Sequence, residues 1–173
     1  MDEDQTRPAE LTAPRLRARQ AREDLNVFSR IPAVYAASRR QGQRLLQSGG
    51  GISIVEWRTL WDLHEAGPMT IRELATIQRS DHSILSRALP EMRRKGFVVM
   101  RQDEQDRRQI IVDLAPAGRA AYARAAPVMA RRRAALRQAF TEDEIARFVG
   151  FLDRLEVFLQ EPVDTFTEED AAG

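Results

Sequence analysis

Cysteine is absent from this chain of 173 residues, and histidine occurs only twice, as His64 and His82. Without a thiol the chain forms no disulfide and offers no cysteine nucleophile or thiol-based redox sensor. Two histidines are too few to build a zinc site of Cys and His ligands within one chain. The lack of a disulfide framework is typical of intracellular proteins, so we expect a cytoplasmic location.

Long apolar runs are also missing, which predicts that the chain does not cross a membrane. The first ten residues, MDEDQTRPAE, lack the apolar centre of a signal peptide. No nucleophile–base pair, phosphate-binding glycine loop or metal constellation is visible, so we expect neither enzymatic activity nor a cofactor. Hydrophobic residues make up 43% of the chain and charged residues 31%, which predicts a globular fold with a sizeable core.

The formal net charge is only +1, but the charges are unevenly placed. The positive residues in the middle of the chain are Arg79, Arg87, Arg93, Arg94, Lys95, Arg101, Arg107 and Arg108. The acidic residues near the end are Glu161, Asp164, Glu168, Glu169 and Asp170. The acidic tail thus offsets a basic middle, which either binds an anionic partner or forms an ordinary solvated face.

Three S/T-x-x-E capping boxes predict where helices begin, because each side chain satisfies a free backbone amide of the other. They pair Ser53 with Glu56, Thr70 with Glu73, and Thr141 with Glu144. The first helix is expected over 54–65, with Trp57, Leu60, Trp61 and His64 on its buried side. The second is expected over 71–78, with Ile71, Leu74 and Ala75 directed inward.

A third helix and a two-stranded ribbon follow. The helix begins near Ser80 or Asp81, either of which is a good N-cap, and ends at Gly96. Segments 97–101 and 109–114 are rich in β-branched residues, and the polar connector between them predicts a hairpin with a projecting loop. Short helices followed by such a ribbon predict a winged helix-turn-helix, a mainly α fold with a small β-hairpin wing (α+β).

Amphipathic helices are predicted on both sides of this region. One spans about 24–47 with an apolar side formed by Leu25, Phe28, Ile31, Val34, Tyr35, Leu45 and Leu46. Pro32 either kinks this helix or lies near the start of its main segment, and Ser48-Gly49-Gly50-Gly51 ends it. Pro116 begins a long helix to about 139, and the last helix carries Phe148, Phe151, Leu152, Leu155 and Leu159.

The order of these elements, together with several motifs, resembles the MarR family of bacterial transcriptional regulators. The resemblance covers roughly Leu25 to Leu159, and its most specific part is SDHSILSR, from Ser80 to Arg87. RRKGFV follows, and then a DxRxxxVxL pattern with a glycine beyond it. The residues that match this last pattern are Asp106, Arg108, Val112, Leu114 and Gly118.

The resemblance implies a sequence-specific, double-stranded DNA-binding regulator, a repressor that a small molecule releases. It also implies a homodimer with interlocked terminal helices, whose operator is a pseudo-palindrome with half-sites ~34 Å apart. Within the matched region it implies an N-terminal dimerisation helix and connector over 24–52, a winged helix-turn-helix over 53–115 and C-terminal dimerisation helices over 116–160. The residues outside it are expected to form a flexible or partly helical arginine-containing arm over 1–23 and an acidic tail over 161–173. Apolar residues at both ends agree with the dimer, because they need a partner surface.

The expected DNA contacts are Thr70, Ser80, Asp81, His82, Ser83, Ser86, Arg87, Asp106, Arg107 and Arg108. Arg87 suits a guanine or a phosphate, whereas Arg108, oriented by Asp106, suits a narrow minor groove. The buried side of the same helix is expected to hold Ile84, Leu85, Ala88, Leu89 and Met92. Asp81 alternatively acts only as an N-cap, and Arg93, Arg94 and Lys95 alternatively complement the helix dipole.

Two positions depart from the family pattern. Pro90 falls inside the recognition helix, where it is expected to bend the helix, and Ala115 stands where the family usually has a capping Thr. The arm residues Arg15, Arg17, Arg19 and Arg22 add either dimer contacts or DNA contacts.

The candidate ligand site consists of Tyr35, Arg39, Trp57, Trp61 and His64, with Trp57, Trp61 and His64 alternatively belonging to the core. Their aromatic and cationic groups suit an aromatic or phenolic acid, free or as a thioester. One alternative function is a winged-helix protein-interaction module, such as an anti-repressor, without sequence-specific DNA binding.

Overall fold

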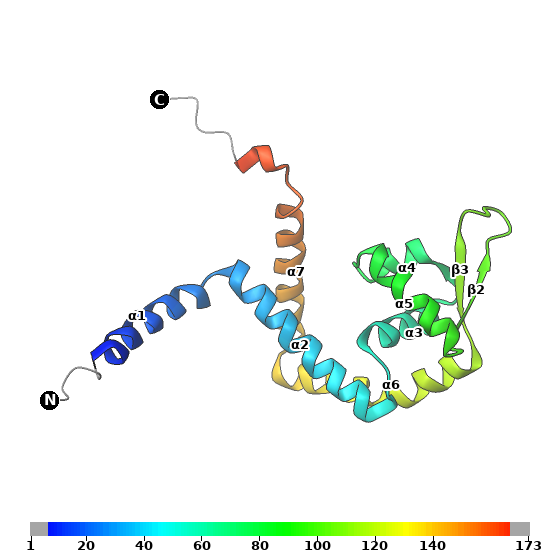
Figure 1. The fold of residues 1–173 in the computed structure, drawn as a ribbon, viewed down its shortest axis with the longest axis horizontal. Helices are drawn as coiled ribbons and strands as arrows, with labels where there is room; N and C mark the ends of the chain where they lie inside the picture. Colours follow the sequence, from blue (N-terminus) through cyan, green and yellow to red (C-terminus); the bar gives the residue numbers. More distant parts are fainter. Residues whose placement is uncertain (1–6, 167–173) are drawn as a thin grey trace. The chain divides into compact units, whose positions relative to one another are not determined.

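The computed structural model describes residues 7–166, and Figure 1 shows the order of its elements. The helices are α1 (Arg7–Asp24), α2 (Val27–Gly50), α3 (Ile54–Ala66), α4 (Ile71–Ile77), α5 (His82–Arg94), α6 (Pro116–Ala139), α7 (Glu142–Phe158) and a short 3₁₀ helix (Val163–Phe166). The strands are β1 (Met69–Thr70), β2 (Val98–Gln102) and β3 (Ile110–Leu114). The mainly helical fold with a small sheet confirms the predicted fold class.

The chain divides between Met129 and Ala130 into two compact units. The first contains the helices and strands from α1 to the first part of α6, and the second contains the rest of α6, α7 and the 3₁₀ helix. The predicted acidic residues Glu168, Glu169 and Asp170 lie outside the described residues. Among the described helices, none combines the length and the apolar content that a membrane span requires.

The three predicted capping boxes are all present, which confirms the predicted starts of α3, α4 and α7. At α4, the hydroxyl of Thr70 accepts the backbone N–H of Glu73 at 3.2 Å, and the Glu73 carboxylate accepts the backbone N–H of Thr70 at 2.7 Å. These bonds lower the pKa of Glu73 below its ordinary value. The same bonds to Thr141 lower the pKa of Glu144.

The N-terminal part contains two helices. α1 lies where the sequence predicts a flexible or partly helical arm, and α2 corresponds to the helix predicted over about 24–47. Asn26 separates them, because its side chain accepts the backbone N–H of Phe28 at 3.0 Å and caps α2. α2 continues to Gly50, and only Gly51, with φ of 66°, takes the left-handed conformation that ends it. A Cβ on Gly49 would lie 2.4 Å from a methyl carbon of Val128, so this glycine permits close packing of α2 on α6 and does not terminate the helix.

The sheet has three antiparallel strands in the order β1-β3-β2, where the sequence predicts only the β2–β3 hairpin. β1 is two residues long, and Met69 pairs with Val112 of β3. The sequence did not predict this strand, because two residues are too few to show the alternation of apolar and polar side chains that marks a strand. The extra strand ties the beginning of α4 to the ribbon that β2 and β3 form in Figure 1.

A core of buried residues joins the sheet to the helices from α2 to the first part of α6. Its buried residues include Leu46, Trp57, Leu60, Leu74, Leu85, Leu89, Met92, Val112, Ala121 and Ala125. Two expectations about burial are wrong. Ile84 is 42% exposed, because the buried stripe of α5 follows Leu85, Leu89 and Met92, and His64 is also exposed at the end of α3.

Helix α6 begins at Pro116 without a capping Thr, as the departure at position 115 predicts. Proline at the first position of a helix requires no hydrogen-bond acceptor for its nitrogen. Ala115 is buried, and its backbone N–H donates to the carbonyl of Phe97 at 3.0 Å. The guanidinium of Arg119 donates to the carbonyl of Leu114 at 2.9 Å. Contacts to neighbouring segments therefore fix this helix start in place of a side-chain cap.

Glu56 is a buried carboxylate at the start of α3, with 5% of its surface exposed. Burial acts to raise its pKa, but hydrogen bonds from Lys95 and Ser53 outweigh burial and hold the pKa below its usual value. A folded-state pKa below the unfolded value adds stability that is present above about pH 4.3 and lost as the pH falls through the folded pKa.

We therefore expect the stability difference between wild type and Glu56→Gln to be largest near neutral pH and to shrink on acidification below about pH 4.3. Urea unfolding at a series of pH values measures this difference. Glu65→Gln, at an exposed position of the same helix, controls for the loss of one charge. A difference between wild type and Glu56→Gln that stays constant across the series would contradict the assigned role of the Glu56 ion pair.

Candidate nucleic-acid interface

Helix α5 begins with an exposed polar turn. Asp81 is its N-cap, and its carboxylate accepts the backbone N–H of Ser83 at 2.8 Å, which lowers the pKa of Asp81. Ser80, the other predicted cap, has a buried hydroxyl that no described residue contacts by a hydrogen bond. Asp81 is therefore exposed at the start of α5, whereas the Ser80 hydroxyl is buried.

Four predicted contact residues of α5 lie together on its exposed face and form two hydrogen-bonded pairs. His82 Nδ1 lies 3.0 Å from the hydroxyl of Ser86. Arg87 donates from Nε to the carbonyl of Ser83 at 3.1 Å and from Nη2 to its hydroxyl at 3.4 Å. These i, i+4 contacts hold the guanidinium and both hydroxyls on one side of the helix. Such groups can donate to guanine O6 and N7 or to phosphate oxygens.

Pro90 lies inside α5, which the structure describes as one helix from His82 to Arg94. Proline has no N–H to donate to the carbonyl of Ser86, four residues earlier. Both Pro90 and Ser86 are exposed, so solvent can satisfy that carbonyl. Pro90 therefore lies on the exposed side of α5.

The turn between α4 and α5 is anchored by Gln78, which sequence reasoning missed. Its side chain is buried and donates to Asp62 at 2.9 Å and to the hydroxyl of Thr59 at 3.4 Å, both on α3. Arg58 donates to its backbone carbonyl. Burial raises the pKa of Asp62. These contacts fix where α5 begins, but the partners are 16 to 20 residues away in sequence, and no local motif marks them.

The wing, which consists of β2, β3 and their connecting loop, ends in an ordered turn. The Asp106 carboxylate accepts the side-chain amide of Gln109 at 3.1 Å and the backbone N–H of Arg108 at 3.0 Å, which lower its pKa. Asp103 and Gln109 close the loop through a backbone bond of 3.1 Å. Arg107 and Arg108 are exposed at this tip. The contact between Asp106 and Arg108 is made through the Arg108 backbone.

The remaining positive residues of the middle segment have intramolecular partners or lie away from the first turns of α5. Arg94 forms a two-point ion pair with Glu91, at 2.6 and 2.7 Å. Lys95 pairs with Glu56 at 2.8 Å. Thr70 is engaged in the capping box of α4, so it lies on a different element from the α5 residues.

The predicted ligand residues fall into two groups. Trp57 is 2% exposed and stacks on Tyr122 of α6, with centroids 5.5 Å apart and planes 4° apart. Trp61 lies 5.8 Å from Trp57, and His64 stacks on Tyr122 at 4.0 Å. Trp57 is therefore part of the core, and Tyr122 is a member that the sequence pattern did not identify.

Tyr35 and Arg39 form the second group, on the exposed part of α2. Arg39 donates to the phenol oxygen of Tyr35 at 3.5 Å. The two line an open hollow of about 590 Å³ together with Ala36, Arg40, Gln43 and Arg44. The hollow combines an aromatic ring with guanidinium groups, which suits an anionic ligand.

Two helices, a buried turn and an adjacent β-ribbon define a winged helix-turn-helix protein. The MarR family model matches residues 52–110. Residues 52–110 are thus similar to the MarR family, and the chain has the fold of solved MarR-family transcriptional regulators. Comparison with curated proteins gives no match.

Solved structures of regulators share this fold at low sequence identity. A MarR/EmrR family transcriptional regulator from Acinetobacter sp. ADP1 has a TM-score of 0.70 and 20% identity, covering 79% of this chain and 96% of that chain. A mutant MarR from E. coli complexed with operator DNA has a TM-score of 0.59 and 22% identity, with 75% and 98% covered. The PcaV regulator from Streptomyces coelicolor, in complex with its natural ligand, has a TM-score of 0.64 and 17% identity, with 76% and 92% covered.

Proposed function

We propose that this protein is a sequence-specific transcriptional regulator that binds double-stranded DNA. The observation that carries the proposal is the exposed face of α5, where Ser83, Ser86 and Arg87 lie together. Gln78 attaches the turn before this helix to α3. A helix of this kind fits the major groove, and the arginines of the wing tip suit the minor groove beside it.

The protein is proposed to act as a homodimer. Exposed apolar residues on and just before α2 include Leu25, Val27, Phe28 and Val34, and those on α7 include Phe148, Phe151 and Val157. Apolar surfaces of this extent are typical of interfaces. A two-fold dimer places two copies of α5 about 34 Å apart, one turn of DNA, and this predicts a pseudo-palindromic operator.

A small anionic ligand is proposed to release the DNA, so that the regulator acts as a repressor. The hollow along α2 supports this, because Tyr35 and Arg39 offer an aromatic face and a guanidinium to an aromatic or phenolic acid. The PcaV structure, in complex with its natural ligand, has the same fold. Such a ligand lowers DNA affinity only if it binds the DNA-free state more tightly than the DNA-bound state.

Selection of bound duplexes from a random DNA pool tests the proposal. We expect enrichment of a pseudo-palindrome whose half-sites are centred about 10 base pairs apart. The enriched duplex should bind about 10³-fold or more tightly than a scrambled duplex at the same salt concentration. Failure to enrich any duplex at low salt would contradict DNA recognition and favour a protein partner for the winged domain.

A further inference from the structure

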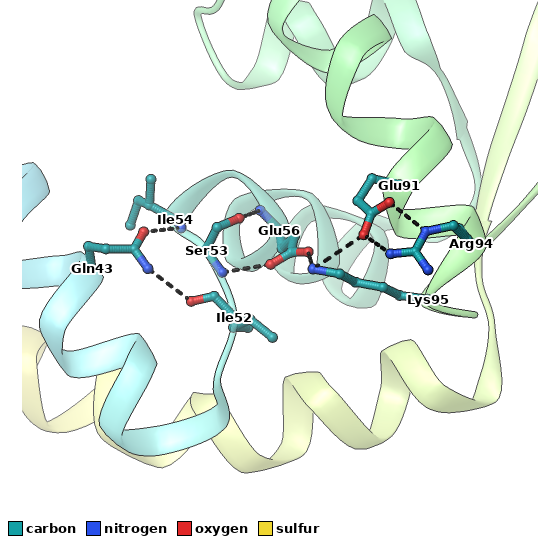
Figure 2. A network of polar contacts seen from close by, with 8 residues as sticks. All are labelled: Gln43, Ile52, Ser53, Ile54, Glu56, Glu91, Arg94 and Lys95. Atoms are coloured by element: carbon teal, nitrogen blue, oxygen red, sulfur yellow. Dashed lines mark hydrogen bonds and ion pairs between the residues drawn. The ribbon is translucent and has the colours of Figure 1, made fainter.

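A chain of polar contacts joins α2 to the far end of α5 within the first unit, and Figure 2 shows it. Its first member is Gln43 of α2. The side-chain oxygen of Gln43 accepts the backbone N–H of Ile54 at 3.0 Å, and its nitrogen donates to the carbonyl of Ile52 at 3.3 Å. One side chain on α2 therefore holds both sides of the N-cap of α3.

Glu56 is the middle member, and its two carboxylate oxygens have different partners. One oxygen accepts the backbone N–H of Ser53 at 2.6 Å and so closes the capping box that Gln43 flanks. The other accepts the ammonium group of Lys95 at 2.8 Å. Glu56 is buried and the Lys95 side chain is 38% exposed, so the ion pair lies at the edge of the core.

Lys95 is the last member and the C-cap residue of α5. Its ammonium group also lies 3.9 Å from Glu91, which in turn pairs with Arg94. The connection therefore reaches α5 at the end opposite to Ser83 and Arg87. The N-terminal end of α5 is held separately, because Gln78 attaches the preceding turn to α3.

These polar contacts constrain the orientation of α5 relative to α2 more narrowly than apolar contacts do. The hydrophobic effect that drives apolar packing is non-directional. Hydrogen bonds and ion pairs have narrow distance and angle requirements. Buried ion pairs add little net stability, but in some proteins they select one packing arrangement.

We propose that Gln43, Glu56 and Lys95 are positioning residues that fix the orientation of α5 relative to α2 and thereby determine which half-site spacing the dimer accepts. The proposal rests on the proposed function, in which α2 takes part in the dimer and α5 reads DNA. One base pair inserted between half-sites rotates them by about 34° relative to each other. If the link from α2 to α5 is rigid, the dimer binds the altered spacing more weakly. If the link is loosened, the affinity for the altered spacing falls less.

The test uses the full-length protein and the duplex enriched from the random pool, with its half-sites moved apart or together by one and two base pairs. The measured quantity is the ratio of Kd at altered spacing to Kd at the selected spacing. For wild type we expect a ratio of about 10 or more for one base pair. For Lys95→Met and for Gln43→Leu we expect the ratio to fall to about 3 or less, with the same preferred bases in each half-site.

Two controls separate positioning from loss of fold. Arg94→Met removes a charge from the same turn of α5 but breaks only the exposed pair with Glu91, so its ratio should match wild type. Lys95→Arg keeps the charge and should restore most of the spacing preference. A variant that is merely less stable loses active protein, which weakens binding to every duplex equally and leaves the ratio unchanged.

The outcomes are distinguishable. A reduced ratio in both Lys95→Met and Gln43→Leu supports the inference. An unchanged ratio in both variants, beside a clear wild-type preference, overturns it and leaves the proposed function intact. A wild type that binds no duplex refutes the proposed function and the inference with it.

Discussion

Arg87→Ala is expected to weaken binding to the selected duplex by roughly 30-fold to 10⁴-fold. Arg87 lies on the exposed face of α5 with its guanidinium held against Ser83, in position for a two-point contact with a guanine or a phosphate. A two-point contact of this kind contributes about 1–3 kcal/mol, and a dimer loses it twice. Fluorescence anisotropy at fixed salt measures the change.

Arg93→Ala is the matched control for this effect. Arg93 lies on the same helix, is exposed and carries the same charge, but it is in the last turn, about 9 Å along the helix axis from Arg87. We expect it to weaken binding by less than about fivefold, which is the loss of a general electrostatic attraction. Equal losses for Arg87→Ala and Arg93→Ala would mean that α5 attracts DNA by charge and does not read it.

Gly118→Ala is expected to destabilise the fold by about 3 kcal/mol or more. A Cβ at this position would lie 2.0 Å from the carbonyl oxygen of Phe97 and 3.1 Å from Leu60. The Phe97 carbonyl also accepts the backbone N–H of Ala115, so it cannot move without breaking that bond. The start of α6 must therefore shift away from Phe97, which opens the core beneath it.

Thermal unfolding measures this effect, and a loss of 3 kcal/mol corresponds to a fall in Tm of roughly 6–12 °C. Gly50→Ala is the control. Gly50 lies on α2, and a Cβ there would be 3.5 Å from the Cβ of Ala125 on α6, which is an ordinary van der Waals contact. That variant should change Tm by no more than about 3 °C. A Tm for Gly118→Ala equal to that of wild type would contradict the close approach of α6 to Phe97.

The sequence was most informative where structure depends on residues close together in the chain. Capping boxes involve residues three positions apart, so Ser53, Thr70 and Thr141 marked their helices correctly. The same applies to the turn of the wing, where Asp106 binds the backbone of a residue two positions later. The DNA-binding candidates on α5 came from a motif of consecutive residues, Ser80 to Arg87, and from the family that it resembles.

Contacts between distant residues were not predictable in the same way. Gln78 contacts α3 across 16 and 19 residues, and Lys95 contacts Glu56 across 39. Nothing in the spacing of Gln78, Lys95 or Tyr122 distinguishes them from ordinary surface residues. Their roles follow only from the packing of α3 against α5 and α6, which depends on the whole core.

In the proposed complex, α5 enters the major groove and the wing tip enters the minor groove of one operator. Dimethyl sulfate footprinting tests both contacts at once, because the reagent methylates guanine N7 in the major groove and adenine N3 in the minor groove. We expect protected guanines in two half-sites about 10 base pairs apart and protected adenines outside them. Arg87→Ala should expose the guanines, and Arg108→Ala should expose only the adenines. Protection that persists unchanged in both variants would contradict the proposed complex.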